Sequence, residues 1–156
     1  MKTKIVYGEN ILFDDHFYDY YQYRSLSFNN KGYLQRWVGK GTIYVGREIL
    51  EHKLNRKLTK NEICDHIDRN KLNYQMDNLR VATRSQSMQN RGKRKNCSSQ
   101  FIGVSWYKAY NCWEAKVIKN GVTLISAYFN NEIEAAKWRD KRAIECFGEF
   151  ASLNFP

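Results

Sequence analysis

The densest cluster of polar side chains in the sequence is Asp65-His-Ile-Asp-Arg-Asn-Lys-Leu-Asn-Tyr-Gln-Met-Asp-Asn-Leu-Arg80. It places a carboxylate, Asp65, directly before an imidazole, His66, and an amide, Asn78, twelve residues later. Carboxylate oxygens suit Mg²⁺ or Mn²⁺, and a histidine with a pKa of about 6.5 can accept a proton from water at neutral pH. The Asn78 amide can hold the other ring nitrogen of that histidine. The cluster therefore predicts a metal-assisted hydrolytic site, although most histidines have no catalytic role.

The chain is basic. It holds 26 Lys and Arg against 16 Asp and Glu, a formal charge of +10. Half of this excess falls in residues 84–96, which contain five basic residues and no acidic one. Such a run predicts a linker or extended arm that lies along nucleic-acid phosphates, where each neutralised charge releases counterions. A solvated charged loop is the alternative. We place a domain boundary near Asn96 and divide the chain into residues 1–83, the basic arm 84–96 and residues 97–156.

The cysteines argue against a structural zinc. Cys64, Cys97, Cys112 and Cys146 are 33, 15 and 34 residues apart, whereas zinc sites use close pairs. We interpret them as free thiols in a reducing compartment. No stretch approaches the roughly 18 apolar residues of a membrane span, so we expect neither a membrane segment nor a signal peptide.

Residues 1–55 predict strands followed by a helix. The stretches 32–38 and 42–45 are rich in β-branched and aromatic residues, and Gly39-Lys-Gly41 between them predicts a hairpin turn. Apolar residues at helical spacing predict a helix over residues 47–55. We expect the tyrosine-rich stretch 17–23 to pack onto the hairpin; stacking of its rings on bases is the alternative.

Residues 97–156 predict three strands and a helix. The strands are expected over residues 102–107, 113–118 and 123–129, with a two-residue turn at Asn120-Gly121. A helix capped by Asn130 or Asn131 then follows and ends at Gly148.

Segments around the polar cluster match a known family. They are Gly32-Tyr33, Tyr44-Val-Gly-Arg-Glu-Ile-Leu50, Glu62-Ile-Cys-Asp-His-Ile-Asp68, Asn78-Leu-Arg-Val-Ala-Thr83 and Gln89-Asn-Arg91. Together they resemble a phage HNH homing endonuclease. Residues 97–156 resemble the DNA-binding domain of plant apetala/ethylene-response-factor proteins, which such nucleases often carry at the C-terminus. The residues that carry this second resemblance are Gly103-Val104, Trp106, Trp113-Glu-Ala115, Phe129, Glu134-Ala-Ala136, Ala143 and Gly148-Glu-Phe-Ala-Ser-Leu-Asn-Phe-Pro156.

The resemblances imply an α+β fold: a ββα-metal (HNH) nuclease core, then a small three-stranded antiparallel sheet packed on one helix. They imply that His66 activates water, Asp65 binds one divalent ion, Mg²⁺ or Mn²⁺, and Asn78 supports the site. The family usually has a second metal ligand, an asparagine, where this sequence has Ser87. Asn90, one helical turn further on, is the alternative ligand. Many relatives also have a histidine where this sequence has Gly46.

The plant domains hold DNA with one face of their sheet, which lies in the major groove. This sequence lacks the arginines that read bases there. The positions expected on the exposed face are Ser105, Tyr107, Glu114, Lys116, Ile118, Thr123 and Ile125. We predict DNA contacts at Arg84, Arg91, Lys93, Arg94, Lys95, Ser105, Tyr107, Lys108, Lys116, Lys119 and Thr123.

Together these features predict a site-specific DNA endonuclease or nickase that acts on double-stranded DNA as a monomer. The alternative is a DNA-binding protein with a decayed nuclease core that acts by occupancy. A third interpretation, an RNA-binding or ribosome-associated protein, has only the charge in its favour. We expect a cytoplasmic location, in the host cell if the protein is phage-encoded.

Overall fold

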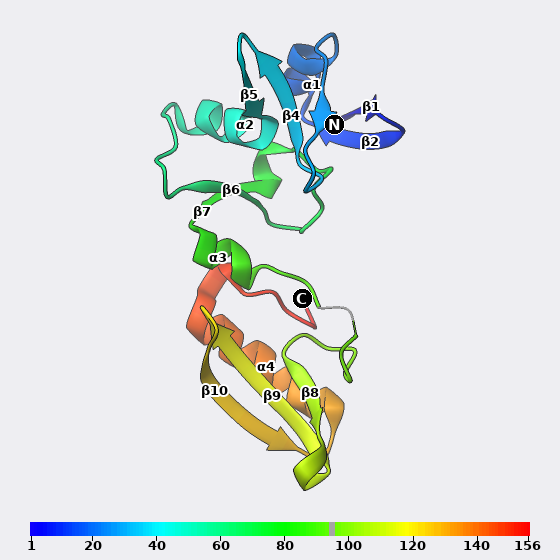
Figure 1. The fold of residues 1–156 in the computed structure, drawn as a ribbon, viewed down its shortest axis with the longest axis vertical. Coiled ribbons are helices and arrows are strands. Elements are labelled where there is room, and N and C mark those ends of the chain that lie inside the picture. Colours follow the sequence, from blue (N-terminus) through cyan, green and yellow to red (C-terminus); the bar gives the residue numbers. More distant parts are fainter. Residues whose placement is uncertain (94–95) are drawn as a thin grey trace. The chain divides into compact units, whose positions relative to one another are not determined.

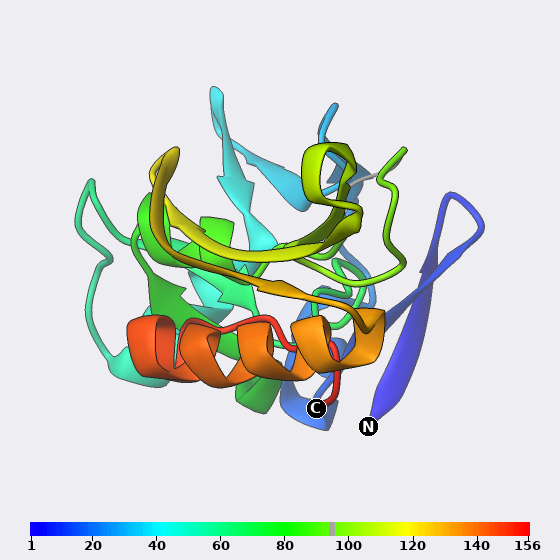
Figure 2. The same ribbon diagram turned by 90° about the horizontal axis from the view of Figure 1, so that it is seen from below.

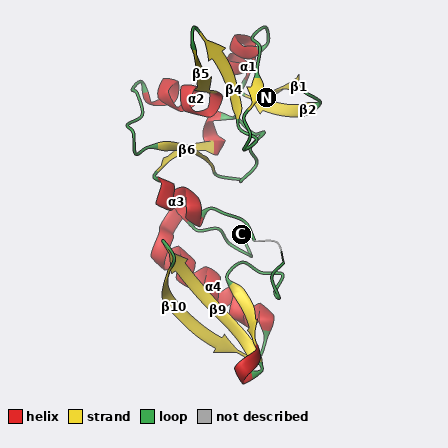
Figure 3. Ribbon diagram, viewed as in Figure 1, coloured by secondary structure: helices red, strands yellow, loops and turns green. Residues whose placement is uncertain are grey.

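The computed structural model describes residues 1–93 and 96–156, which form two compact units, Met1–Arg84 and Ser85–Pro156 (Figure 1). Each unit combines helices with antiparallel strands (Figure 3), so the α+β class is confirmed. Arg94 and Lys95, two of the predicted DNA contacts, lie outside the described residues. Within the part of the chain that the structure describes, no helix is long and apolar enough to cross a membrane.

The first unit is built from hairpins, a small sheet and two helices. It opens with β1 (Lys2–Val6), β2 (Glu9–Phe13) and α1 (Asp15–Tyr21). The sheet of β3 (Ser27–Phe28), β4 (Leu34–Val38) and β5 (Gly41–Tyr44) follows, then α2 (Val45–Leu54). A further hairpin joins β6 (Ile63–His66) to β7 (Leu79–Ala82) through a loop that ends in the 3-10 turn η1 (Met76–Asn78). The predicted β4–β5 hairpin and the helix after it are both confirmed.

The tyrosine-rich segment packs onto that hairpin, as predicted. The Tyr21 hydroxyl donates a hydrogen bond to Glu48 of α2 at 2.6 Å, and Arg36 Nε of β4 donates to the same carboxylate at 2.8 Å. Arg36 also donates to the Tyr20 hydroxyl at 3.4 Å. Burial opposes ionisation of Glu48, but the hydrogen bonds from Arg36 and Tyr21 outweigh it and lower the pKa of that carboxyl. These bonds tie α1, β4 and α2 together.

The basic stretch 84–96 differs from the expected extended arm in its first half. Residues Arg84–Gln89 form helix α3. This segment contains neither glycine nor proline, so no backbone feature opposes a helical turn there. Gly92 and Asn96, the latter with φ +59°, lie beyond the helix.

The second unit has the predicted order of three strands and a helix. Strands β8 (Val104–Tyr107), β9 (Cys112–Lys119) and β10 (Val122–Phe129) form an antiparallel sheet in the order β10-β9-β8, with the 3-10 turn η2 (Lys108–Tyr110) between β8 and β9. Helix α4 (Glu132–Phe147) lies along one face of this sheet (Figure 2). The Asn131 side chain caps α4 by accepting hydrogen bonds from the amides of Ile133 and Glu134. Gly148 ends the helix, and the 3-10 turn η3 (Gly148–Phe150) begins the tail.

The C-terminal tail is fixed by a buried carboxylate on α4. Asp140 accepts hydrogen bonds from the amides of Asn154 at 2.6 Å and Phe155 at 3.0 Å, and from the Asn154 side chain at 3.0 Å. Gly103, which has φ +71°, lies so close that an added Cβ would be 2.7 Å from the Lys116 carbonyl and 2.9 Å from Arg139. Gly103 and the tail residues Asn154 and Phe155 are therefore part of this unit's packing.

Candidate active site

Asp65 and His66 form the end of strand β6. They pair with Arg80 and Leu79 of β7, and each is only 6% exposed. Successive side chains of a strand point to opposite faces. Accordingly, the Asp65 carboxylate contacts Arg80, while the His66 imidazole lies against two tyrosine rings.

His66 lies in an aromatic environment. The Tyr74 ring meets the imidazole edge-on, with centroids 5.1 Å apart, and Tyr33 stacks against it at 6.2 Å. Burial is the largest influence on His66 and lowers its pKa; Asp68 and Asp65 oppose this, and Lys71 adds to it. The net effect is a lowered pKa, so the imidazole is neutral at neutral pH. A neutral imidazole is the form that can accept a proton.

Asp65 is one half of a buried ion pair. Its Oδ2 lies 3.1 Å from Arg80 Nε, and the two side chains are 7% and 10% exposed. Among the described residues, no group of three or more His, Cys, Asp or Glu could hold a metal ion. Mg²⁺, however, keeps several waters and needs only one or two protein carboxylates besides substrate phosphates. The single carboxylate of Asp65 fits such an ion, provided that Asp65 can bind the ion and Arg80 at the same time.

The Asn78 amide closes the loop that follows His66. Its Oδ1 accepts a hydrogen bond from the Asp68 amide at 3.0 Å. Its Nδ2 donates to Asp68 Oδ1 and to the Asn73 carbonyl, both at 2.9 Å. These bonds shape the loop that leaves His66. That the Asn78 amide also holds the imidazole itself stays a prediction.

Strand β2 and the residue after it hold the loop between His66 and Asn78 in place, a role that the sequence did not indicate. Strand β2 exchanges backbone hydrogen bonds with it: the Leu12 amide donates to the Leu72 carbonyl, and the Tyr74 amide donates to the Leu12 carbonyl, both at 2.9 Å. Asp14 Oδ2 accepts a hydrogen bond from the Met76 amide at 2.6 Å. These partners are about sixty residues apart in the chain, so no local pattern could have predicted them.

Gly46 has a steric explanation. A Cβ added to this residue of α2 would lie 2.8 Å from Cys64 Sγ and 3.4 Å from Tyr74 Cε1. The space that a histidine would need is thus occupied by the residue before Asp65 and by the ring that contacts His66. Burial, and then the nearby Asp65 charge, raise the pKa of the Cys64 thiol to about 12, so it remains neutral.

The two candidates for a second metal ligand lie in and just after α3. Ser87 is half-buried within the helix. Asn90 is 7% exposed, and its backbone amide donates to the Gln86 carbonyl at 3.4 Å. Both residues belong to the second unit, and their part in a metal site with Asp65 stays a prediction.

The predicted DNA contacts of the second unit are on the sheet and its turns, except Arg91 and Lys93, which follow α3. The exposed residues are Arg91, Lys93, Lys108, Lys119 and Thr123, whereas Ser105, Tyr107 and Lys116 are half-buried. Arg84, the last residue of the first unit, is also exposed. Because Ala115 packs against α4, the alternating residues Glu114 and Lys116 are on the other face of β9.

Two residues expected on that outer face are placed differently. Glu114 is not exposed: it is 7% accessible, and its Oε2 lies 2.8 Å from Lys116 Nζ. Ile125 is exposed as expected, at 38%, but it pairs with the buried Val117, because the register of β10 shifts by one residue between Thr123 and Ile125. A one-residue shift moves a side chain to the opposite face of a sheet.

A group of aromatic rings on the second unit went unnoticed in the sequence. Tyr107, Tyr110 and Tyr128 lie with ring centroids 5.4 to 6.2 Å apart. Tyr110 and Tyr128 are 73% and 50% exposed. Tyr107 and Tyr110 are three residues apart in the chain, and the strand register brings Tyr128 of β10 beside them.

An Asp-His pair at the end of a two-stranded hairpin that is followed by a helix is the arrangement expected of a metal-dependent nuclease. Comparison with known proteins agrees: residues 55–89 match the sequence profile described as HNH endonuclease. The chain is 37% identical over 114 residues to the uncharacterized HNH endonuclease L560 of Acanthamoeba polyphaga mimivirus, covering 73% of this chain and 58% of that protein. It is 31% identical over 97 residues to protein 3.8 of Escherichia phage T7, covering 62% of this chain and 79% of that protein.

The chain therefore belongs to the HNH endonuclease family. It spans little more than half the length of the mimiviral relative. No solved structure matches it significantly.

Proposed function

We propose that the chain is a site-specific DNA endonuclease or nickase of the homing type, which hydrolyses a phosphodiester with the help of one Mg²⁺ or Mn²⁺ ion. The observation that carries this proposal is the His66 imidazole, buried between two tyrosine rings and adjacent to Asp65 on β6. A neutral, oriented imidazole is suited to take a proton from the attacking water.

The described side chains divide the work. His66 accepts the proton of water on a ring nitrogen, and Asp65 would hold the metal, with Ser87 or Asn90 as the second ligand. Such an ion would supply Lewis-acid stabilisation of the negative charge that develops during hydrolysis. Arg80 fixes the orientation of the Asp65 carboxylate, and Asn78 positions the loop that follows His66.

We assign DNA recognition to the second unit, as a domain over residues 97–156 similar to the plant apetala/ethylene-response-factor domains, with residues 84–96 as a basic connection. The sheet on one helix and the exposed lysines Lys108 and Lys119 support this assignment. The Glu114–Lys116 pair weakens Lys116 as a phosphate contact, because its charge is already neutralised. Direct readout then falls to the remaining face residues Ser105, Tyr107 and Thr123.

The second candidate function is DNA binding without cleavage. It is favoured by the Asp65–Arg80 ion pair, which competes with a metal for the carboxylate, and by the serine at position 87. In this case the protein acts by occupying its site on the duplex.

Cleavage of supercoiled plasmid separates the two functions. We expect nicked or linear product with Mg²⁺ or Mn²⁺, and intact plasmid with EDTA or with the His66→Ala variant. A matched control is His52→Ala, a histidine of α2 that the proposal leaves outside the site. Intact plasmid under all conditions, together with retained duplex binding, would instead establish the non-cleaving function.

A further inference from the structure

The loop between His66 and Asn78 presents two basic side chains next to the candidate active site. Arg69 and Lys71 are both exposed. Arg69 has φ +65°, a left-handed conformation that favours glycine or asparagine. The turn that imposes this conformation is closed by a hydrogen bond of 3.0 Å from the Arg69 amide to the His66 carbonyl. The loop therefore holds an arginine where the backbone would more readily accept glycine.

Lys71 is held beside the ring that borders His66. Its Nζ donates a hydrogen bond of 2.8 Å to the Lys31 carbonyl and lies 4.6 Å from the centroid of the Tyr33 ring. Tyr33 in turn stacks on the imidazole at 6.2 Å. These contacts orient the ammonium group without neutralising it, because a carbonyl and a ring carry no net charge.

No carboxylate cancels this charge within residues 1–93 and 96–156. Asp68 is the acid closest to Lys71 in the chain, but its carboxylate is occupied by other donors. It accepts hydrogen bonds from the Asn70 amide at 2.8 Å, from Asn73 Nδ2 at 2.8 Å and from Asn78 Nδ2 at 2.9 Å. The Lys71 charge thus remains available to a ligand.

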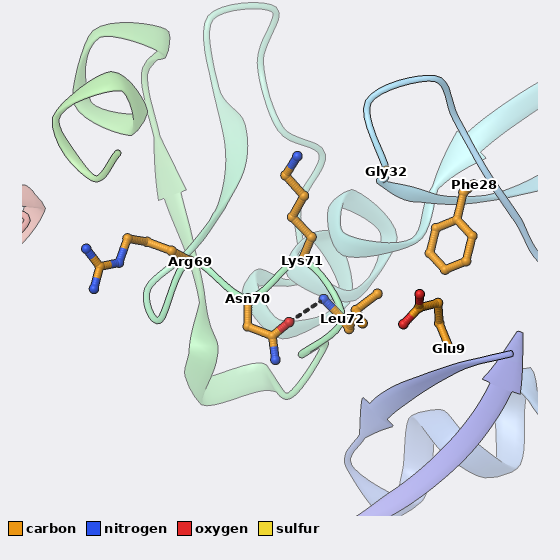
Figure 4. A pocket seen from close by; sticks show the side chains of 7 residues that line it. All are labelled: Glu9, Phe28, Gly32, Arg69, Asn70, Lys71 and Leu72. Atoms are coloured by element: carbon orange, nitrogen blue, oxygen red, sulfur yellow. Dashed lines mark hydrogen bonds between the residues drawn. The ribbon is translucent and has the colours of Figure 1, made fainter. Parts of the chain in front are cut away.

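An open hollow of about 470 Å³ lies beside this loop, and the Arg69 guanidinium extends away from its apolar side (Figure 4). Phe28 and Leu72 give it an apolar lining, and Lys71 and Arg69 border it on the loop side. Glu9 lies near Phe28 on the other side (Figure 4). A nucleic-acid backbone has matching chemistry, since its sugars are partly apolar and its phosphates are anionic. The repulsion from Glu9 places the phosphates nearer to Lys71.

We propose that Lys71, with Arg69 beside it, binds the backbone of the DNA strand to be cut, at phosphates flanking the scissile one. The proposal rests on the function proposed above only in taking DNA as the ligand. It assigns to this loop the task of bringing the strand to His66. Lys71 and Arg69 act in binding, not in proton transfer.

Binding measured without cleavage tests the proposal. The full-length His66→Ala chain is titrated, in EDTA, against a fluorescent duplex of mixed sequence between about 50 and 200 mM salt. Each lost phosphate contact reduces the slope of log K against log salt by about 0.9. For Lys71→Met, the affinity ratio of parent to variant should therefore shrink about 3.5-fold over this salt range. Lys71→Arg should retain most of the slope.

Two further variants sharpen the result. Lys60→Met removes the same charge from an exposed lysine between α2 and β6, and its slope should equal that of the parent. Glu9→Gln removes the repulsive charge and should tighten binding. Equal slopes for Lys71→Met and Lys60→Met, or no gain with Glu9→Gln, would overturn the proposal.

The outcome is independent of catalysis. If Lys71→Met changes the salt slope but the protein with His66 intact does not cut DNA, the phosphate site stands and the endonuclease function is refuted. If the protein with His66 intact cuts DNA but Lys71→Met leaves the salt slope unchanged, the endonuclease function stands and the phosphate site is refuted. If Lys71→Met disorders the loop, the Glu9→Gln and Lys71→Arg results still decide, because both variants keep a cation at position 71.

Discussion

Substitution of Gly46 by alanine should destabilise the first unit through one identifiable clash. The added Cβ would lie 2.8 Å from Cys64 Sγ, closer than such atoms approach in proteins. Overpacking of this kind costs about 1–3 kcal/mol. Alanine also favours a helix over glycine by up to about 1 kcal/mol, and Gly46 lies in α2. We therefore expect a net loss of about 1–2 kcal/mol.

Replacement of Cys64 by alanine should abolish the loss of stability that Gly46→Ala causes, or turn it into a small gain. Without Sγ, the nearest remaining atoms are Tyr74 Cε1 at 3.4 Å and the Cβ of residue 64 at 3.6 Å, which are ordinary contacts. In the Cys64→Ala background, Gly46→Ala should be neutral or stabilising by up to about 1 kcal/mol, because only the helix propensity remains. The two substitutions should thus show a coupling energy of about 1–3 kcal/mol.

Amide hydrogen exchange of the full chain is the suitable assay. It reports the opening free energy of α2, β6 and β7 separately from that of the second unit, which need not unfold with them. An equal loss from Gly46→Ala in both backgrounds would refute the steric explanation. Gly46→His should be worse than Gly46→Ala, which means that the histidine common in relatives cannot be restored at this position by a single change.

Three further substitutions test contacts inside one unit or the other. Asp14→Ala removes the acceptor of the 2.6 Å bond from the Met76 amide and should cost about 1.5–3 kcal/mol; unchanged exchange at Met76 would contradict this. Glu48 has a lowered pKa in the fold, so the stability that it contributes with Arg36 is present above its ordinary pKa of 4.5 and is lost as pH falls through the lower folded value. The difference in urea stability between parent and Glu48→Gln should therefore shrink below about pH 4.5, and a constant difference would count against the ion pair. Asp140→Ala leaves the tail amides without their acceptor and the buried Arg139 without its carboxylate partner and should cost about 3–5 kcal/mol, seen as a lowered melting temperature of the second unit; a loss below about 1 kcal/mol, as for a surface pair, would be inconsistent with that role.

Local signals in the sequence predicted much of the fold, because turns and caps depend on neighbouring residues. The two-residue turn at Asn120-Gly121 lies between β9 and β10 as expected. Asn131 caps α4 with its own side chain, and Gly148 ends it. By contrast, the shift near Ile125 inserts a single residue without any turn signal and moves that side chain to the other face.

The candidate site was predictable in composition but not in its contacts. The adjacent Asp65 and His66 were evident because they are neighbours in the chain. The clamp of Leu12 and Asp14 on the loop could not be predicted, because pairing between segments so far apart leaves no pattern in either one. The same holds for Gly46, whose restriction comes from Cys64 on a different strand.

The Asp65–Arg80 pair explains how a single carboxylate can remain ionised in a buried position without a metal ion. An unpaired buried charge is costly, and strand pairing places Arg80 opposite Asp65, where its Nε meets the carboxylate. The pair therefore keeps the site folded without an ion. Under the proposed function, a divalent ion held by Asp65 would displace Arg80, and the freed guanidinium would be suited to pair with a DNA phosphate.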